Sequence, residues 1–338
     1  KNYQATLDLV EEILLEPRWD ANEFERIKKS TINQLRQQKA VPTAIAQNEY
    51  NKLIYGENNI RSRNILGTIE SVNAITVADL EAFYAKNFSP AVARAHIVGD
   101  IDKTIVEKSL GDLGKKWRAK PVSVPSYETP KAPATSKVYF YDVPEAKQSV
   151  INFGYPALAV TDKDFYPATV MNYRLGGGGF ASEFTQQLRE GKGYTYGIGS
   201  GFNGTKSAGP FTIFSRIRTN VTLEGAQLIK KILDEYPKNF AKKDLDTTQG
   251  FLVKSNARAF ETARAKLGLL NNISKYGWNY DYVKDREKIV KSITVEEVKK
   301  LSEKYLDTNK MIWLVVGDAK TQLPRLKELG FGDPVRLN

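Results

Sequence analysis

The stretch LGGGGFASEFTQQLREGKGYTYGIGSGF, Leu175 to Phe202, has the most informative pattern in the chain. A helix-like run ends in four glycines, a second helix is predicted over Ala181–Glu190, and a Gly-Lys-Gly break leads into an alternating strand, Tyr194–Phe202. Arg189 closes the helix and Tyr196 opens the strand, so both side chains are expected to reach one bound group. A guanidinium offers five donors and a phenol one. This pair suits a peptide carbonyl, or the oxyanion that forms when that carbonyl is attacked.

The glycines around this pair predict two backbone features. Gly176, Gly177, Gly178 and Gly179 allow a tight turn and a close approach to a partner or a peptide, and they are predicted to bind substrate. Gly197, Gly199 and Gly201 occupy alternate strand positions and leave one face bare for packing. A phosphate-binding loop is excluded, because no Gly-Lys-Ser/Thr follows the glycines.

The segment resembles the second-domain signature of the inverted-motif zinc peptidases, the M16 family. That family includes pitrilysin, the insulin-degrading enzymes, the mitochondrial processing peptidases and bacterial relatives. The resemblance rests on Leu-Gly-Gly followed by Leu-Arg-Glu-x-Lys-Gly-x-x-Tyr, with Arg189 and Tyr196 in the family's Arg/Tyr positions. Without the resemblance, the alternative is an interdomain ion pair for Arg189 and a half-buried strand tyrosine for Tyr196.

Composition limits the class of protein. The 338 residues suffice for two domains, and 41% of them are hydrophobic, which is typical of a globular chain. No apolar run approaches the length of a membrane helix, and the first residues read as an amphipathic helix rather than a signal peptide. The net charge of +11 comes from Lys and Arg scattered among acidic neighbours. A solvated basic surface is therefore favoured over a nucleic-acid site.

The chain contains an internal repeat. Val72–Asp100 aligns without a gap onto Val290–Asp318, and each copy predicts an amphipathic helix followed by a buried strand that ends in Val-Gly-Asp. Thr76 and Thr294 are predicted N-caps, with capping-box partners three positions on. Upstream, the helix that begins near Glu23 matches the one near Asp244.

The repeat predicts the domain organisation. The second copy has a front section, Lys137 to about Asn220, for which the first copy has no counterpart, so we expect the chain to be a fragment. The prediction is an α+β fold of two M16-type α/β units, each an antiparallel-rich sheet packed by helices. Residues 1–117 are the C-terminal part of a first unit truncated at its N-terminus, 118–136 a Pro-rich extended linker, and 137–331 a complete second unit.

Zinc ligands are scarce. The chain has no cysteine and one histidine, His96, whose repeat equivalent is Leu314, so a half-buried strand histidine is favoured over a metal ligand. By resemblance, the missing front section would contain the His-x-x-Glu-His zinc helix, and a third ligand would be a Glu further on. Alignment puts Gln34 at that position and Ile27 at a supporting Glu. Either this half is non-catalytic or the alignment is one turn out; the former is favoured, with no metal in this chain.

The resemblance implies a role in a clamshell peptidase. Zinc is expected in a partner half, upstream in the same polypeptide or on a separate subunit. Tyr196 is predicted to donate to the oxyanion, and Arg189 to anchor a substrate carbonyl or carboxylate. The alternative is a purely structural or peptide-binding module, as in the family's respiratory-complex core subunits. The sequence leaves the compartment open, with a bacterial periplasm favoured over the cytoplasm.

Overall fold

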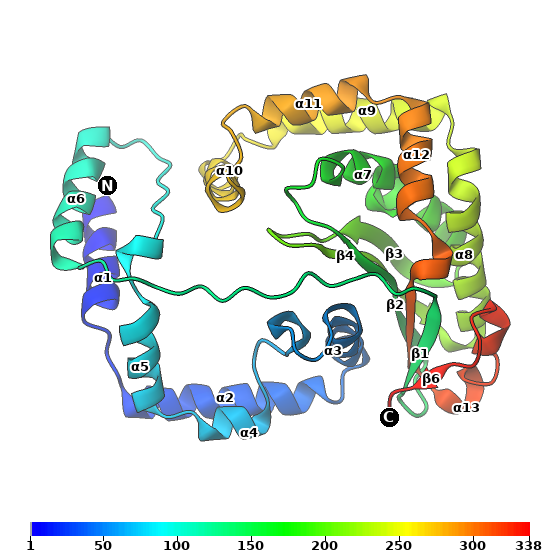
Figure 1. The fold of residues 1–338 in the computed structure, drawn as a ribbon, viewed down its shortest axis with the longest axis horizontal. Coiled ribbons are helices and arrows are strands. Elements are labelled where there is room, and N and C mark those ends of the chain that lie inside the picture. The colour runs from blue at the N-terminus through cyan, green and yellow to red at the C-terminus, as the bar shows by residue number, and fades with distance from the viewer. Residues whose placement is uncertain (1) are drawn as a thin grey trace. The chain divides into compact units, whose positions relative to one another are not determined.

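The chain folds into helices and one mixed β-sheet (Figure 1), in a computed structural model that describes residues 2–338 and leaves aside the side chains of residues 257 and 258. The helices are α1 Tyr3–Leu15, α2 Ala21–Gln38, α3 Pro42–Tyr55, α4 Ile69–Ala74, α5 Val77–Asn87, α6 Lys103–Lys116, α7 Phe165–Asn172, α8 Thr222–Asn239, α9 Lys242–Arg258, α10 Ala263–Tyr276, α11 Tyr282–Ser292, α12 Val295–Tyr305 and α13 Ala319–Gln322. The strands are β1 Lys137–Asp142, β2 Gln148–Leu158, β3 Thr195–Phe202, β4 Gly209–Arg218, β5 Ile312–Gly317 and β6 Val335–Arg336. The predicted α+β class is confirmed.

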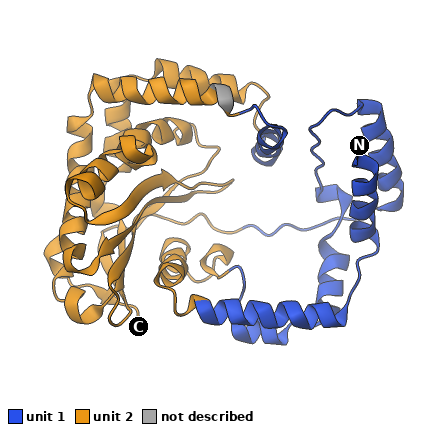
Figure 2. Ribbon diagram, turned by 180° about the vertical axis from the view of Figure 1, so that it is seen from behind, with its two compact units in different colours: residues 1–37, 65–126, 260–277 blue, residues 38–64, 127–259, 278–338 orange. Residues whose placement is uncertain are grey.

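The chain divides into two compact units (Figure 2) that do not follow the boundary between the sequence copies. The first unit comprises Lys1–Gln37, Ile65–Ser126 and Phe260–Gly277, and the second comprises the remainder. Residues 38–64, from the first copy, therefore belong to the second unit, and residues 260–277, from the second copy, belong to the first. Residues 118–133, most of the predicted linker, contain no helix or strand, and a bend follows at residues 134 and 135.

The sheet of the second unit has the strand order β3-β4-β2-β5-β1-β6 within the described residues. β2 pairs antiparallel with both β4 and β5, and β1 pairs parallel with β5. β5 is buried at every position, as expected for the apolar run Ile-Trp-Leu-Val-Val in the middle of a sheet covered on both faces.

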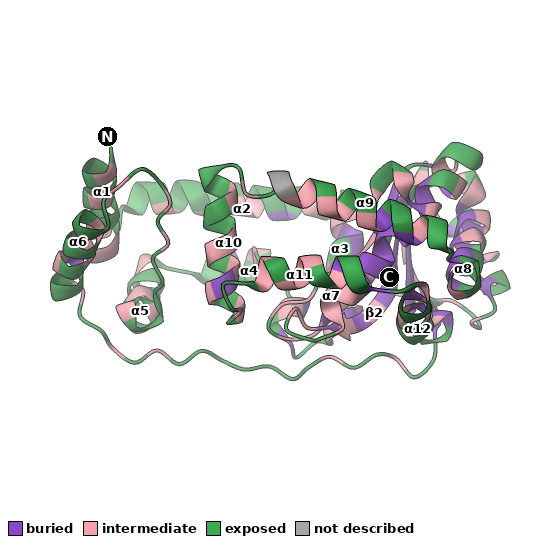
Figure 3. Cartoon of the chain, turned by 90° about the horizontal axis from the view of Figure 1, so that it is seen from above, coloured by how far each residue is buried: buried purple, intermediate pink, exposed green. Residues whose placement is uncertain are grey.

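Both faces of this sheet are covered by helices. One face packs against α7, α8 and α12 in the larger core, which includes Phe153 and Trp313 with ring centroids 4.5 Å apart. The other face packs against α3, whose Ile45, Tyr50 and Ile54 lie among the sheet's apolar residues. Figure 3 shows the buried residues concentrated around β2 and α8.

Tyr50 fixes α3 to the sheet through a close contact. Its hydroxyl donates to the Phe211 carbonyl oxygen at 3.2 Å, and burial raises the pKa of the phenol, so it stays a protonated donor. Beneath it, Gly154 has a φ of 151°, and a Cβ there would lie 1.9 Å from the same carbonyl oxygen. Only glycine leaves room for this contact.

The two copies of the repeat form matching helices. Both predicted capping boxes are present, with Thr76 and Thr294 each accepting a hydrogen bond from the backbone N–H three residues on. α3 and α10 are both 14 residues long, and each ends at a tyrosine followed by a glycine of positive φ, Gly56 and Gly277.

The predicted strand of the first copy is wrong. Residues 93–98 form neither helix nor strand, whereas their equivalents in the second copy are β5. A strand exists only when its backbone pairs with neighbours. β5 lies between β1 and β2, and the described part of the first unit has no strands for such pairing. His96 is half-buried, as predicted, but not in a strand, and its Nε2 has no hydrogen-bond partner.

Hydrogen exchange is expected to separate these two equivalent segments. In the isolated chain, the amides of residues 93–98 should exchange like those of an open loop, because no ladder bond protects them. The amides of β5 should exchange more slowly by several orders of magnitude, approaching the rate set by global unfolding. Mass spectrometry of the exchanged chain measures both segments in one sample. Equal protection of the two would contradict this account.

The first unit has few buried apolar residues. Among its described residues, the large buried hydrophobic side chains are Leu35, Val72, Leu113 and Ile273, while Ile13 is 67% and Phe83 60% exposed. These exposed apolar side chains are accessible for contact with another polypeptide. None of the described helices is long and apolar enough to cross a membrane.

Candidate functional site

The motif segment contains two π-helical turns. α7 runs into a first turn at Tyr173–Gly177, and a second at Thr185–Gly191 replaces most of the predicted helix Ala181–Glu190. Their wider hydrogen bonds join Gly178 N–H to the Tyr173 carbonyl at 2.7 Å and Lys192 N–H to the Gln187 carbonyl at 3.1 Å. π-helical turns are rare and occur frequently at functional sites. Residue spacing alone does not distinguish them from α-helix.

Gly176 allows the first π-helical turn to pack against β3. A Cβ at this position would lie 2.2 Å from Ser200 Oγ and 2.8 Å from Ser200 N. Asn172 reinforces the contact, since its Nδ2 donates to the Ser200 carbonyl at 2.8 Å and its Oδ1 accepts from Ser200 Oγ at 2.6 Å. Gly176 is buried in this contact. Gly177 and Gly179 are exposed and Gly178 is half-buried, and substrate binding by the four glycines stays a prediction.

Tyr196 lies at a β-bulge and is 86% exposed. The register of β3 against β4 shifts between Thr195 and Ile198, so Tyr196 and Gly197 together lie opposite the single residue Arg216 of β4. Thr195 stabilises the bulge, because its hydroxyl donates to the Arg216 carbonyl at 2.7 Å and accepts from Gly197 N–H at 3.0 Å. Bulges of this kind re-aim side chains next to functional sites. The half-buried alternative for Tyr196 is wrong.

Arg189 is held by its own segment. Its Cζ lies 4.6 Å from the centroid of the Phe180 ring, and its Nε lies 3.5 Å from Glu190 Oε1. Among the described residues, no hydrogen bond or stacking contact joins Arg189 to Tyr196. The structure therefore brings Arg189 against Phe180 and leaves Tyr196 extended without a partner.

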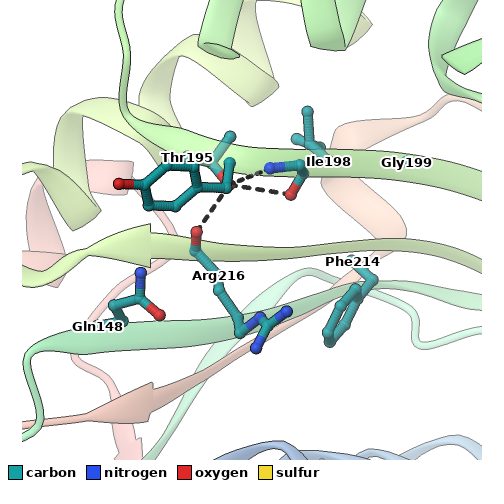
Figure 4. Close-up of a pocket in the computed structure, with 8 residues that line it drawn as sticks. Gln148, Thr195, Ile198, Gly199, Phe214 and Arg216 are labelled. Carbon is teal, nitrogen blue, oxygen red and sulfur yellow. Dashed lines mark hydrogen bonds between the residues drawn. The ribbon is translucent and has the colours of Figure 1, made fainter. Parts of the chain in front are cut away.

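A pocket of about 490 Å³ lies beside the bulge (Figure 4). Three strands supply its walls: Gln148 from β2; Phe214 and Arg216 from β4; and Thr195, Tyr196, Gly197, Ile198 and Gly199 from β3. Phe214 is 41% exposed, and Gly199, which is opposite to it in the register, has no side chain to cover the ring. The volume falls within the usual range of ligand pockets.

The sequence reasoning missed Gln148, Thr195, Phe214 and Arg216. A signal for two of them exists in β4, where buried and more exposed positions alternate along Gly209–Arg218. Phenylalanine and arginine at the outward positions of such a strand indicate a functional face. Thr195 and Gln148 have no comparable signal, because their roles depend on the bulge and on strand pairing.

The first copy lacks the donors of a zinc site. Gln34 and Ile27 are both exposed on α2, and α2 presents a neutral amide at the expected ligand position. The described residues contain no group of three or more His, Cys, Asp or Glu side chains that could hold a metal ion. The described residues of this chain therefore do not form a site that fits a zinc ion.

Comparison with known proteins identifies the family. The family model described as the peptidase M16 inactive domain matches residues 74–252, more than half of the 338 residues. The chain belongs to the M16 peptidase family. The match includes the whole of the motif segment, and it assigns this M16 chain to the family's inactive half.

Curated relatives of this M16 chain are described as uncharacterised zinc proteases. It is 23% identical to one from Bacillus subtilis, over 77% of this chain and 62% of the relative. It is 26% identical to one from Streptomyces coelicolor, over 66% of this chain and 48% of the relative. The chain thus spans about half to three-fifths of the length of these two relatives.

Solved structures share the fold. A peptidase M16 inactive domain from Pseudomonas fluorescens is 26% identical, with a TM-score of 0.85 over 94% of this chain and 75% of that one. The first half of the periplasmic protease PqqL from Escherichia coli is 14% identical, with a TM-score of 0.71 over 97% of this chain and 75% of that one. At that identity the second likeness concerns the fold alone.

This M16 chain is expected to retain no stoichiometric zinc. After incubation with zinc and dialysis, metal analysis should find well below one ion per chain, because Gln34 carries no charge to offset the cation and His96 is the only histidine. His96→Ala should not change the retained amount. One tightly held zinc per chain would contradict the reading of Gln34.

Proposed function

We propose that this M16 chain is the non-zinc half of a zinc metallopeptidase, and that it holds the peptide and assists oxyanion stabilisation. The observation on which the proposal rests is Tyr196, which is 86% exposed at a bulge beside a pocket. The Tyr196 hydroxyl has no hydrogen-bond partner among the described residues, and the bulge fixes the backbone that holds it. The hydroxyl is therefore available to donate a hydrogen bond to a ligand. Preorganised donors of this kind stabilise developing charge because they need no rearrangement during the reaction.

The peptide is proposed to bind over the sheet face rather than along the edge of β3. Part of that edge is already used, since the carbonyl oxygens of Ile198 and Ser200 accept from Thr185 and Asn172. Addition of a peptide strand needs free backbone groups at a sheet edge. The pocket around Tyr196, by contrast, is open and lined by side chains from three strands.

Arg189 is proposed to anchor a carbonyl or carboxylate of the substrate. Its guanidinium stacks over Phe180, which is itself 64% exposed. Stacking restricts the side chain while its N–H donors remain in the guanidinium plane, where they can bind a carbonyl or carboxylate. Phe180 is therefore a positioning residue for Arg189.

The partner is proposed to be a zinc-bearing M16 segment, supplied by the same polypeptide or by a separate subunit. The exposed apolar side chains of α1 and α5, Ile13 and Phe83 among them, favour such a contact. So does the segment 93–98, whose repeat equivalent is a strand inside a sheet. Strands of the partner would pair with this segment, as β1 and β2 pair with β5.

Mixing tests the proposal. The chain is combined with its zinc-bearing counterpart, and cleavage of an unstructured fluorogenic peptide is followed. Turnover well above that of the counterpart alone is expected, because only the mixture has both the zinc chemistry and the donors of this chain. A mixture that forms a complex but cleaves no faster would favour the alternative, a structural or peptide-binding module.

A further inference from the structure

Arg216 is a cation without a carboxylate in the pocket beside Tyr196. No Asp or Glu lines this pocket, and among the described residues no ion pair includes Arg216. Three other arginines of the same unit are paired: Arg174 with Asp244 at 3.0 Å, Arg325 with Glu224 at 2.7 Å and Arg336 with Asp142 at 2.9 Å. The pocket thus has a positive wall that no carboxylate of the described chain neutralises.

Strand pairing places two further groups beside Arg216. Phe214 precedes it by two positions on β4, so both side chains lie on the same face of the sheet. On the neighbouring strand, Val150 lies opposite Arg216 and Gln148 opposite Arg218, which puts Gln148 diagonally next to Arg216. Figure 4 shows the side chains of Gln148, Arg216 and Phe214 on one side of these strands.

We propose that this pocket is a subsite for a carboxylate of the bound peptide. Arg216 would take both carboxylate oxygens in a bidentate pair, the geometry that a guanidinium matches best. The Gln148 amide adds a donor, and the Phe214 ring contacts the apolar part of the same or the next residue. The carboxylate belongs to an Asp or Glu side chain or to the peptide's C-terminus. The inference rests on the proposed peptide-holding function and adds to it a preference for peptides that carry a carboxylate at this subsite.

Peptide binding by the full chain tests the subsite. Three short, unstructured peptides, each labelled with an uncharged dye that has no carboxylate, are compared by fluorescence anisotropy at low salt: one with an internal Glu and an amidated C-terminus, one with Gln in its place and a free C-terminus, and one with Gln and an amidated C-terminus. We expect one carboxylate peptide to bind about tenfold more tightly than the neutral one, as for a charge-assisted hydrogen bond. Which of the two it is identifies the source of the carboxylate.

Variants of two arginines separate the subsite from a general effect of charge. Arg216→Gln should remove the preference for the carboxylate peptide. Arg216→Glu should reverse it, so that a fourth peptide with Lys in place of the internal Glu binds more tightly than the Glu peptide. Arg218→Gln is the matched control: Arg218 is also exposed, two positions further along the same strand and outside the pocket lining, so the preference should persist. Circular dichroism verifies that each variant is folded.

Each outcome decides the matter. A preference that survives Arg216→Gln, or that falls equally in Arg218→Gln, overturns the subsite. Equal binding of all three peptides overturns the subsite and leaves the peptide-holding function standing. If none of the peptides binds the wild-type chain, the proposed function fails, and the subsite fails with it.

Discussion

Replacing Tyr196 with phenylalanine is expected to lower peptide turnover by the assembled peptidase about a hundredfold, while the KM changes little. The phenol is 86% exposed and has no hydrogen-bond partner within the described chain, so its removal leaves the fold untouched. Under the proposed function, the substitution removes a donor to the oxyanion, and the loss of one such donor commonly costs about a hundredfold or more in kcat. Steady-state kinetics of the mixture with the zinc-bearing counterpart measures both constants.

A matched tyrosine provides the control. Tyr280 is 84% exposed and lies outside the pocket lining, so Tyr280→Phe should leave both kinetic constants unchanged. Arg189→Ala should raise the KM at least as strongly as it lowers kcat, because an anchor also contributes in the ground state. Unchanged turnover in both Tyr196→Phe and Arg189→Ala would reject the assisting role.

The second large effect concerns stability, and we expect Gly154→Ala to destabilise the second unit by about 3–5 kcal/mol. The added methyl group would lie 1.9 Å from the Phe211 carbonyl oxygen and 2.6 Å from the Tyr50 hydroxyl, so the backbone itself has to move. The φ of 151° adds strain that an L-residue carries and glycine does not. Backbone strain and overpacking each cost about 1–3 kcal/mol. Urea unfolding followed by tryptophan fluorescence, with Trp313 fully buried, measures the change.

Gly201→Ala is the control for this experiment. Gly201 also lies within a strand of the same sheet, but a Cβ there would meet nothing within 4 Å. Its substitution should change the free energy of unfolding by less than about 1 kcal/mol. Equal effects of the two substitutions would show that the contact between α3 and the sheet does not depend on Gly154.

The local elements of the second unit could largely be predicted from the sequence. β3 begins one residue later than the predicted strand Tyr194–Phe202 and ends at the predicted residue. The family also followed from the motif, because glycine spacing and the Arg/Tyr pair are local features. Local pattern and tertiary structure agree here, since every strand finds the neighbours that its apolar face requires.

The failures arise where structure depends on distant partners. Residues 93–98 align with β5 in the repeat but form no strand, because their place in the repeat cannot replace a paired neighbour. The exchange of residues 38–64 and 260–277 between units was not predicted, since an amphipathic helix does not specify which sheet it covers. The bulge at Tyr196 depends on the Thr195 hydroxyl, which looks like any strand threonine in the sequence.

The packing of α3 against the sheet limits where the chain can be divided into independent parts. Because α3 comes from the first copy and the sheet from the second, removal of residues 38–64 would expose the face around Val150 and Leu314. Substitutions in α3 and in the sheet that it covers are expected to have coupled effects on stability, although β2 and β5 both lie far from α3 in the chain. A fragment that begins at the Pro-rich linker is therefore expected to expose this face, whereas a fragment that begins before α3 keeps it covered.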